Sequence, residues 1–193
     1  MADNNIILLV GLGNPGSEYK NHRHNVGFMV MDGLQSFYAS NKKWKDKFSA
    51  QYCDTSIDGQ KVILCKPQTF MNRSGLAVSQ LMQFYKINSD NLIVFHDDID
   101  LNFGQIKIKK GGGHGGHNGL RDIDKSIGNN YQRVRMGVGH PRHLTPPRDV
   151  SHYVLSDFDG DEASKITEII NKMVKNCQYI IKNDMVNFLE HIK

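Results

Sequence analysis

The sequence of 193 residues has few cysteines and no long apolar run, and each shortage excludes a class of protein. Its three cysteines, Cys53, Cys65 and Cys177, are widely spaced and form no CxxC pair. This pattern argues against a disulfide framework and against a structural zinc site. No apolar stretch approaches the roughly 20 residues that span a bilayer. We therefore expect no association with a membrane.

The start of the chain lacks the features of a targeting segment. The residues MADNN carry no basic flank and no small-residue cleavage site. The apolar run IILLV that follows therefore predicts a β-strand and not a signal peptide. We expect a cytoplasmic protein.

The net charge of the chain is a mild +4, but acidic residues are scarce between positions 107 and 148. A charge of this size is compatible with a polyanionic partner but is common in proteins without one. The distribution is more informative, because the basic residues gather between positions 107 and 148, namely Lys107, Lys109, Lys110, Arg121, Lys125, Arg133, Arg135, Arg142 and Arg148.

Apolar periodicity divides the chain into alternating strands and helices. The run 6–10 is typical of a strand buried on both faces, and Val26, Val30 and Leu34 recur at helical spacing. Two strand-like runs flank Asp58-Gly59, a dipeptide favoured in type I′ hairpin turns. Further strands are predicted at 91–100, 104–110 and 131–139, and further helices after an N-cap at Ser74, at 120–127 and at 166–181.

These elements predict a single α/β domain over residues 1–193. Strands that alternate with helices, together with one hairpin, favour a twisted mixed β-sheet flanked by helices on both faces. Ligands of such sheets bind beyond the carboxyl ends of the strands. Polar loops follow four predicted strands, and we expect them to meet at one mouth: GLGNPG with YKNHRHN, KPQTFMNRSG, HDDID and GGGHGGHNG.

Three interpretations compete for the glycine-rich loops. The series Gly11, Gly13 and Gly16 matches GxGxxG, but Pro15 and a polar run follow where a dinucleotide site needs a helix, and no GK[ST] exists. A metal site is the second, with candidate ligands among His22, His24, His114, His117, Asp97, Asp98 and Asp100, whose spacing matches no recognised pattern. The third is a loop that sets one polar side chain beside a substrate.

A histidine and a carboxylate without a serine or cysteine partner favour general-base activation of water. The carboxylate would hold one imidazole nitrogen and stabilise the imidazolium that forms on proton removal. Three asparagines of these loops, Asn14, Asn72 and Asn118, are candidates to supply amide dipoles to an acyl substrate.

Five motifs in order resemble the bacterial peptidyl-tRNA hydrolase family across nearly the whole chain. They are GLGNPGSEYKNHRHNVG, KPQTFMNRSG, HDDIDL, GGGHGGHNGLRDI and GVGHP. The resemblance implies hydrolysis of the ester between a peptide and its tRNA, by an enzyme that needs neither a metal nor a cofactor. It also implies contact with the 3′ end and the 5′ phosphate region of tRNA, and we expect a monomer.

The resemblance assigns roles residue by residue. His24 matches the catalytic base, Asp97 the acid that stabilises it, and Asn14 the residue that distinguishes N-blocked peptidyl-tRNA from free aminoacyl-tRNA. Lys109 and Arg135 resemble a basic pair that clamps the tRNA 5′ phosphate. Positions that match substrate contacts near the 3′ end and the peptide are Tyr19, Phe70, Met71, Asn72 and Asn118.

Alternation along the two basic strands predicts a surface that binds phosphates without reading sequence, with Lys107 and Lys109 on one strand and Arg133 and Arg135 on the other. His117 is expected to fix its loop, and solvated positions are expected for His22, His114, His140 and His143. The proline-containing segment 140–155 is expected to be a surface excursion that covers the groove. Two other functions stay open: an RNA-binding module without turnover, as in chloroplast splicing factors similar to this family, and a metal-dependent hydrolase.

Overall fold

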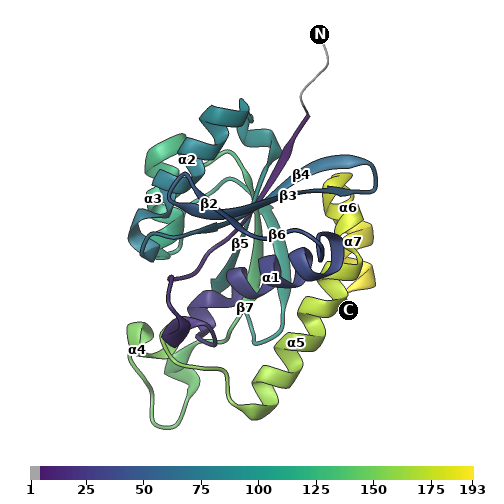
Figure 1. Cartoon of the computed structure of the whole chain (residues 1–193). Coiled ribbons are helices and arrows are strands. Elements are labelled where there is room, and N and C mark those ends of the chain that lie inside the picture. The colour runs from purple at the N-terminus through teal and green to yellow at the C-terminus, as the bar shows by residue number, and fades with distance from the viewer. Residues whose placement is uncertain (1–4) are drawn as a thin grey trace.

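The structure is a computed structural model that describes residues 5–193, so the first four residues of the predicted domain lie outside it. Its seven-stranded sheet has the spatial order β2-β3-β4-β1-β5-β7-β6 (Figure 1). Strands β4, β1, β5 and β7 are parallel, and the remaining pairs are antiparallel. The predicted mixed sheet is therefore confirmed. The strands are β1 (Ile7–Gly11), β2 (Lys45–Lys47), β3 (Ala50–Ile57), β4 (Gln60–Pro67), β5 (Leu92–Asp98), β6 (Ile106–Lys110) and β7 (Gln132–Gly137).

Helices cover both faces of the sheet (Figure 1). Helices α1 and α5 pack into the core that contains Leu9 of β1, whereas α2 and α3 pack into the core that contains Leu8 and Val10. Because successive side chains of a strand point to opposite faces, β1 is apolar throughout, as its sequence predicts. The helices are α1 (Val26–Tyr38), α2 (Ser74–Tyr85), α3 (Asn118–Ile127), α4 (Val150–Val154), α5 (Gly160–Lys175), α6 (Cys177–Ile181) and α7 (Met185–His191).

The hairpin between β3 and β4 turns where the sequence predicts it. Asp58 and Gly59 have φ values of 52° and 80°. A type I′ turn requires positive φ at both central residues, so this dipeptide sets the register in which Ile57 pairs with Gln60.

Two glycines let β1 and α1 approach closely. A Cβ on Gly11 would lie 2.0 Å from the carbonyl oxygen of Gly27, and a Cβ on Gly27 would lie 2.3 Å from the backbone nitrogen of Leu12. The first glycine of GxGxxG therefore serves strand–helix packing. The chain passes through a 3₁₀ turn at Ser17–Tyr19 before α1 begins at Val26, so the loop does not run straight into a helix as a dinucleotide site requires.

Two helix predictions need correction. Ser74 is not the N-cap of α2, because Arg73 holds that position and the Ser74 hydroxyl donates to the carbonyl of Met71 at 2.8 Å. The predicted helix 166–181 is broken at Asn176 into α5 and α6. The Asn176 side chain donates to the carbonyl of Lys172 at 2.9 Å, the kind of local bond by which asparagine competes with a helix.

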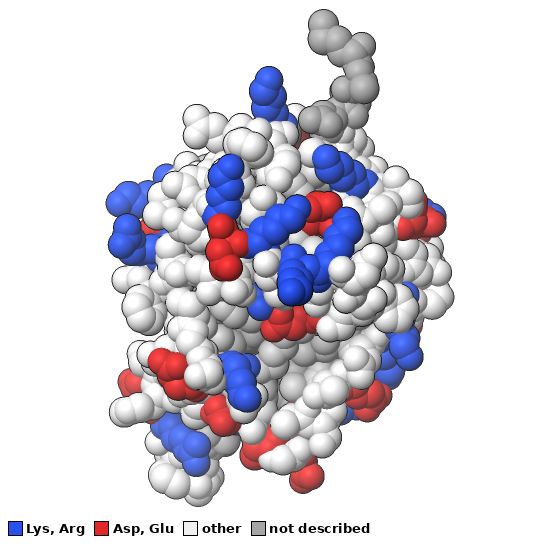
Figure 2. Space-filling model, in the orientation of Figure 1, with Lys and Arg blue, Asp and Glu red and all other residues white. Residues whose placement is uncertain are grey.

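The segment 140–155 is a surface excursion, as predicted. It contains a 3₁₀ turn at Pro141–His143 and the short helix α4, and residues 142–152 are exposed. Within residues 5–193, no helix combines the length and the apolar character needed to cross a membrane. On the face drawn in Figure 2, Lys and Arg side chains gather over β2 and β3, with Asp and Glu side chains among them.

Candidate active site

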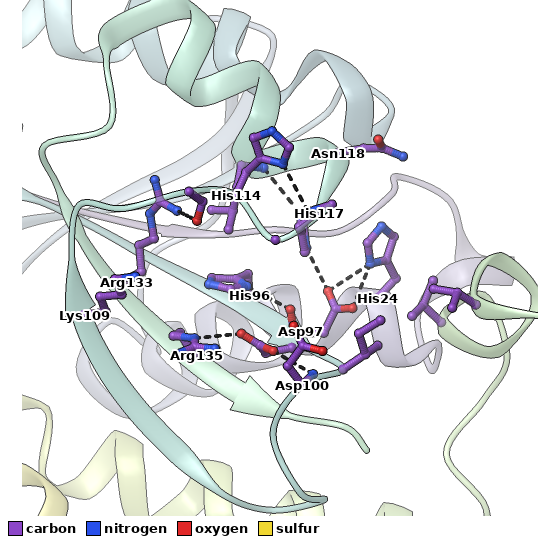
Figure 3. Close-up of a pocket in the computed structure, with 18 of the residues that line it drawn as sticks. His24, His96, Asp97, Asp100, Lys109, His114, His117, Asn118, Arg133 and Arg135 are labelled. Carbon is purple, nitrogen blue, oxygen red and sulfur yellow. Dashed lines mark hydrogen bonds and ion pairs between the residues drawn. The ribbon is translucent and has the colours of Figure 1, made fainter. Parts of the chain in front are cut away.

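A cleft of about 520 Å³ opens beside the carboxyl end of β5 (Figure 3). The glycine loop borders one side, and α4 contributes Val150 and Val154. Half of the predicted site residues line it: His24, Asp97, Lys109, Asn118 and Arg135. The others lie outside its lining: Asn14, Tyr19, Phe70, Met71 and Asn72.

The centre of the cleft is a cluster of two imidazoles on one carboxylate, His24, Asp97 and His117 (Figure 3). His24 Nδ1 lies 2.8 Å from Oδ1 and 3.0 Å from Oδ2 of Asp97. His117 Nε2 lies 2.9 Å from the same Oδ1. Asp97 is 3% exposed, so these two imidazoles satisfy a carboxylate that water does not reach. The family resemblance pairs Asp97 with His24, but it does not indicate that His117 also bonds this carboxylate.

Hydrogen bonds fix the tautomer of each ring. His117 Nδ1 accepts from the backbone N–H groups of Gly119 and Leu120 at 3.1 and 3.3 Å, so its proton is on Nε2 and is donated to Asp97. His24 likewise donates from Nδ1, which leaves a lone pair on its Nε2. A lone pair on the nitrogen away from the carboxylate is what a general base needs.

The pKa values of the pair shift in the directions expected of such a base. Burial lowers the pKa of His24, but the charge of Asp97 and its hydrogen bond outweigh burial, and the net shift is upward from 6.5. Burial raises the pKa of Asp97, yet the facing imidazoles bring it well below its usual range. The carboxylate therefore stays charged, and it stabilises the protonated form of the His24 imidazole.

His96 is a third histidine in the cleft wall. Its Nδ1 lies 2.8 Å from the backbone oxygen of Asp97, and its ring centre lies 5.2 Å from that of His117. Burial, and next the neighbouring His117, lower the pKa of His96 to about 3. The ring is therefore neutral at physiological pH and donates from Nδ1, which fixes the backbone beside the Asp97 carboxylate.

The glycine loop ends by capping α3 with a side chain. His117 is the N-cap, and its ring accepts from the first turn of the helix, so it fixes its loop as predicted. Gly119 follows at a crowded point, where a Cβ would lie 2.6 Å from Met71 Sδ. Asn118 at the helix start is exposed and lines the cleft. The end of the glycine loop thus positions the His117 imidazole against Asp97 and leaves the Asn118 amide exposed in the cleft.

Asn14 is held by two neighbours. The side chain of Asn25 bonds both its backbone groups, at 3.0 Å to N and 2.9 Å to O. The Asn14 Oδ1 accepts from the backbone N–H of Met71 at 2.8 Å, which assigns the amide orientation. Its Nδ2 then has no hydrogen-bond partner among residues 5–193 and can donate to a ligand.

Of the remaining predicted substrate contacts, Phe70 and Asn72 are exposed, and Met71 between them is buried. Phe70 is 60% exposed and meets Tyr19 edge to face, with ring centres 6.5 Å apart. Phe70 is therefore not a core residue. Tyr19 and Phe70 therefore present two partly exposed aromatic rings near the loop that carries Asn14.

The predicted basic surface needs one correction. Arg133 is only 2% exposed, and it donates to the carbonyl of Gly113 at 2.9 Å and to Asp124 at 2.8 Å. It tethers the glycine loop to β7 and is not open to a phosphate. Lys107 and Lys109 on β6 are exposed, whereas Arg135 is partly buried and pairs with Asp98 at 2.7 Å.

The loop glycines also make room for Lys109. Gly112 has a φ of 88°, and a Cβ there would lie 2.5 Å from Lys109 Nζ. The lysine side chain thus folds against the loop at the rim of the cleft. Lys109 and Arg135 line the same cleft as His24 (Figure 3), although none of the ion pairs within residues 5–193 includes Lys109.

The three central residues also offer metal-ligating atoms, all within 4.8 Å of one another. Sequence spacing does not reveal this grouping. In the structure, however, His24 Nδ1 and His117 Nε2 both carry a proton and donate a hydrogen bond to Asp97. A cation bound between these atoms would have to displace both protons. The geometry describes a hydrogen-bonded cluster, and independence of a metal stays a prediction.

Arg23 joins the histidine segment to the wall formed by α4. It donates to Ser156 Oγ at 2.7 Å, forms an ion pair with Glu162, and lies 4.4 Å from the ring centre of Tyr153. His22 beside it is half-buried and 3.8 Å from Asp157, so it is not the fully solvated residue that we predicted. No local sequence pattern indicates this contact, since the partners lie more than a hundred positions apart in the chain.

The chain is similar over nearly its whole length to known peptidyl-tRNA hydrolases. A family model described as peptidyl-tRNA hydrolase matches residues 8–193. The peptidyl-tRNA hydrolase of Rickettsia felis is 44% identical over 187 residues, which cover 97% of this chain and 100% of the relative. That of Rhodospirillum centenum is 43% identical over 96% of this chain and 80% of the relative. The crystal structure of peptidyl-tRNA hydrolase from Acinetobacter baumannii superposes with a TM-score of 0.87 at 38% identity, over 98% of this chain and 95% of that one. The chain therefore belongs to the peptidyl-tRNA hydrolase family.

Proposed function

We propose that this chain hydrolyses the ester between a peptide and the ribose of its tRNA, and so releases free tRNA, by means of a water molecule activated by His24. The observation that carries the mechanism is the double contact of His24 Nδ1 with Asp97. It holds the ring in one tautomer with the Nε2 lone pair available. An ester is activated relative to an amide, so an activated water suffices and no covalent intermediate is required.

In the proposed reaction, His24 Nε2 removes a proton from water as the oxygen attacks the ester carbonyl. The imidazolium that forms is stabilised by Asp97, which His117 holds from its other side. The proton then passes from His24 to the leaving ribose oxygen, and the tetrahedral centre collapses to a free carboxylic acid. We assign donation to the developing oxyanion to Asn118, which lines the cleft at the start of α3.

Selection for blocked substrates follows from the orientation of Asn14. Because Met71 N–H occupies its oxygen, the amide offers only N–H donors to a ligand. A blocked α-amino group brings a carbonyl acceptor to this position, whereas a free α-ammonium brings only donors. We assign the discrimination between peptidyl-tRNA and aminoacyl-tRNA to this mismatch.

We assign tRNA binding to two surfaces near the cleft. Lys109 and Arg135 offer cations to backbone phosphates, with no base-specific contact required. Tyr19 and Phe70 offer ring faces to unpaired bases at the 3′ end, and such stacking contributes about 1 to 3 kcal/mol per base. Both surfaces tolerate any sequence, which suits an enzyme that acts on many tRNAs.

The test is release of tRNA from N-acetyl-aminoacyl-tRNA and from unblocked aminoacyl-tRNA, in EDTA, with His24→Ala as the inactive control. We expect rapid cleavage of the blocked substrate only, lost in the variant. Turnover that requires an added divalent cation would support the metal-dependent alternative. Salt-sensitive tRNA binding without cleavage would identify a binding module. Size-exclusion chromatography of the same preparation tests the proposed monomer.

A further inference from the structure

A second cavity, of about 160 Å³, borders the Asn14 loop and shares no lining residue with the main cleft. Its size suits one amino-acid side chain and not a nucleotide. The residues that line it are Asn14, Pro15, Gly16, Lys20, Asn25, Phe28, Met29, Asp32, Gln51, Lys66 and Gln68.

Lys66 is the unusual residue of this cavity, because lysine is almost never fully buried without a partner. It is 8% exposed, and its Nζ lies 2.6 Å from Asp32 Oδ1. Trp44 and Phe28 flank it, with ring centres 4.4 and 5.7 Å from Nζ. An ammonium has three N–H donors, and Asp32 is its only hydrogen-bond partner among residues 5–193. Lys66 thus keeps donors for a ligand in the cavity that it lines.

The charges of the lining are unbalanced toward positive. The lining contains two lysines, Lys20 and Lys66, and one acid, Asp32, whose side chain is 54% exposed. Lys20 forms no ion pair with any of residues 5–193. Two amides, Gln51 and Gln68, supply further polar groups. A carboxylate would complete this set by balancing the second lysine and accepting from the buried ammonium.

We propose that this cavity receives the side chain of the peptide residue that precedes the esterified one, and that it favours an acidic side chain. The inference rests on the proposed function, in which His24 activates the attacking water and Asn14 contacts the blocked amino group. Asn25, the residue after His24, holds the backbone of Asn14. A peptide that extends past Asn14 reaches the space bordered by Pro15 and Gly16, which is this cavity.

The test compares N-acetyl-Glu-Ala-tRNA with N-acetyl-Gln-Ala-tRNA, which differ in charge and hardly in shape. We expect the native chain to favour the glutamate substrate in kcat/KM by about tenfold, the lower end of the effect of one hydrogen bond to a charged group. Lys66→Met keeps the apolar stem between the rings and should bring the ratio close to one. Asp32→Asn releases the ammonium from its partner and should raise the ratio above the native value. Lys175→Met, an exposed lysine on α5, is the matched control and should keep the native ratio.

A native ratio near one with both substrates cleaved would overturn the subsite alone, and so would a native preference that persists in Lys66→Met. If Lys66→Met does not fold, Asp32→Asn decides, because an unchanged or lower ratio in that variant contradicts the assignment. Cleavage of neither substrate by the native chain would reject the proposed function and this inference with it.

Discussion

Replacing Asp97 with asparagine removes one charge from the centre of the cluster and changes little in shape. The lost contact is a hydrogen bond between a carboxylate and the imidazolium of the transition state, at 2.8 Å. Such bonds contribute about 1.5 to 3 kcal/mol, or roughly 10- to 150-fold in rate. If the new amide turns its NH₂ toward His24 Nδ1, the proton moves to Nε2 and the base is blocked, which raises the loss toward about 10⁴-fold. We therefore expect Asp97→Asn to lower kcat/KM by about 10-fold to 10⁴-fold.

The pH profile separates this mechanism from simple damage to the fold. In the native chain, kcat/KM should rise with pH through the pKa of His24, which Asp97 holds above 6.5. Without that charge, burial acts unopposed and lowers the pKa of the imidazole. The midpoint of the residual activity of Asp97→Asn should therefore move to lower pH. The assay is hydrolysis of N-acetyl-aminoacyl-tRNA at low substrate concentration between pH 5 and 9.

The matched control is Asp98→Asn, which removes a carboxylate that pairs with Arg135 and not with an imidazole. Its pH midpoint should stay at the native value. An Asp97→Asn variant that keeps kcat/KM within threefold of native, or whose midpoint moves to higher pH, would contradict the role assigned to Asp97.

Three further predictions concern stability and tRNA binding. The pKa of His96 is lowered to about 3 in the folded chain, so its contribution to stability is complete above pH 6.5 and is lost as pH falls toward 3. Between pH 7 and 5, this effect of His96 should lower the free energy of unfolding of the native chain by about 2 kcal/mol. In urea titrations at the two pH values, the free energy of unfolding of His96→Gln should fall by about 2 kcal/mol less than that of the native chain. Equal falls in the two proteins would contradict the assignment. Lys109→Ala combined with Arg135→Ala should weaken tRNA binding and reduce the slope of log K against log salt by about 1 to 2, and an unchanged slope measured by fluorescence anisotropy would exclude phosphate contacts. Gly27→Ala should lower the free energy of unfolding by several kcal/mol, since its Cβ would lie 2.3 Å from the nitrogen of Leu12, and a melting temperature within 2 °C of native would show that the helix can shift.

The parts of the fold that sequence predicts well are those set by local chemistry. Positive φ at Asp58 and Gly59 follows from the residues themselves, and the apolar run of β1 follows from burial on both faces. The predicted helix boundaries are wrong where a polar side chain can form either of two local hydrogen bonds. Ser74 bonds a preceding carbonyl and does not cap the helix, and Asn176 interrupts a helix whose apolar periodicity continues across it. The apolar periodicity of a sequence does not indicate which of these hydrogen bonds a side chain forms.

In the candidate site, motif resemblance assigned roles to single residues, and the structure shows where their side chains lie. The position of His24 next to Asp97 accords with its predicted role, whereas the second imidazole on that carboxylate, His117, was expected only to fix its loop. Arg133 alternates in sequence with Arg135 and was placed on the same open surface, yet its ion pair with Asp124 buries it. Alternation reports which face a residue occupies, and whether that face is covered depends on a helix and a loop distant in sequence.

The chain separations within the central cluster bear on how the protein folds. His24 and Asp97 lie 73 positions apart, and His117 lies 20 positions further on. Closing loops of this length is entropically unfavourable until the intervening strands have paired, so parallel pairings of this kind form slowly. Strand β5 holds Asp97 only once β1 flanks it on one side and β7 on the other. Recovery of the cluster during refolding is therefore a late event, and an amide exchange experiment should find β1 and β5 protected before the three side chains have assembled.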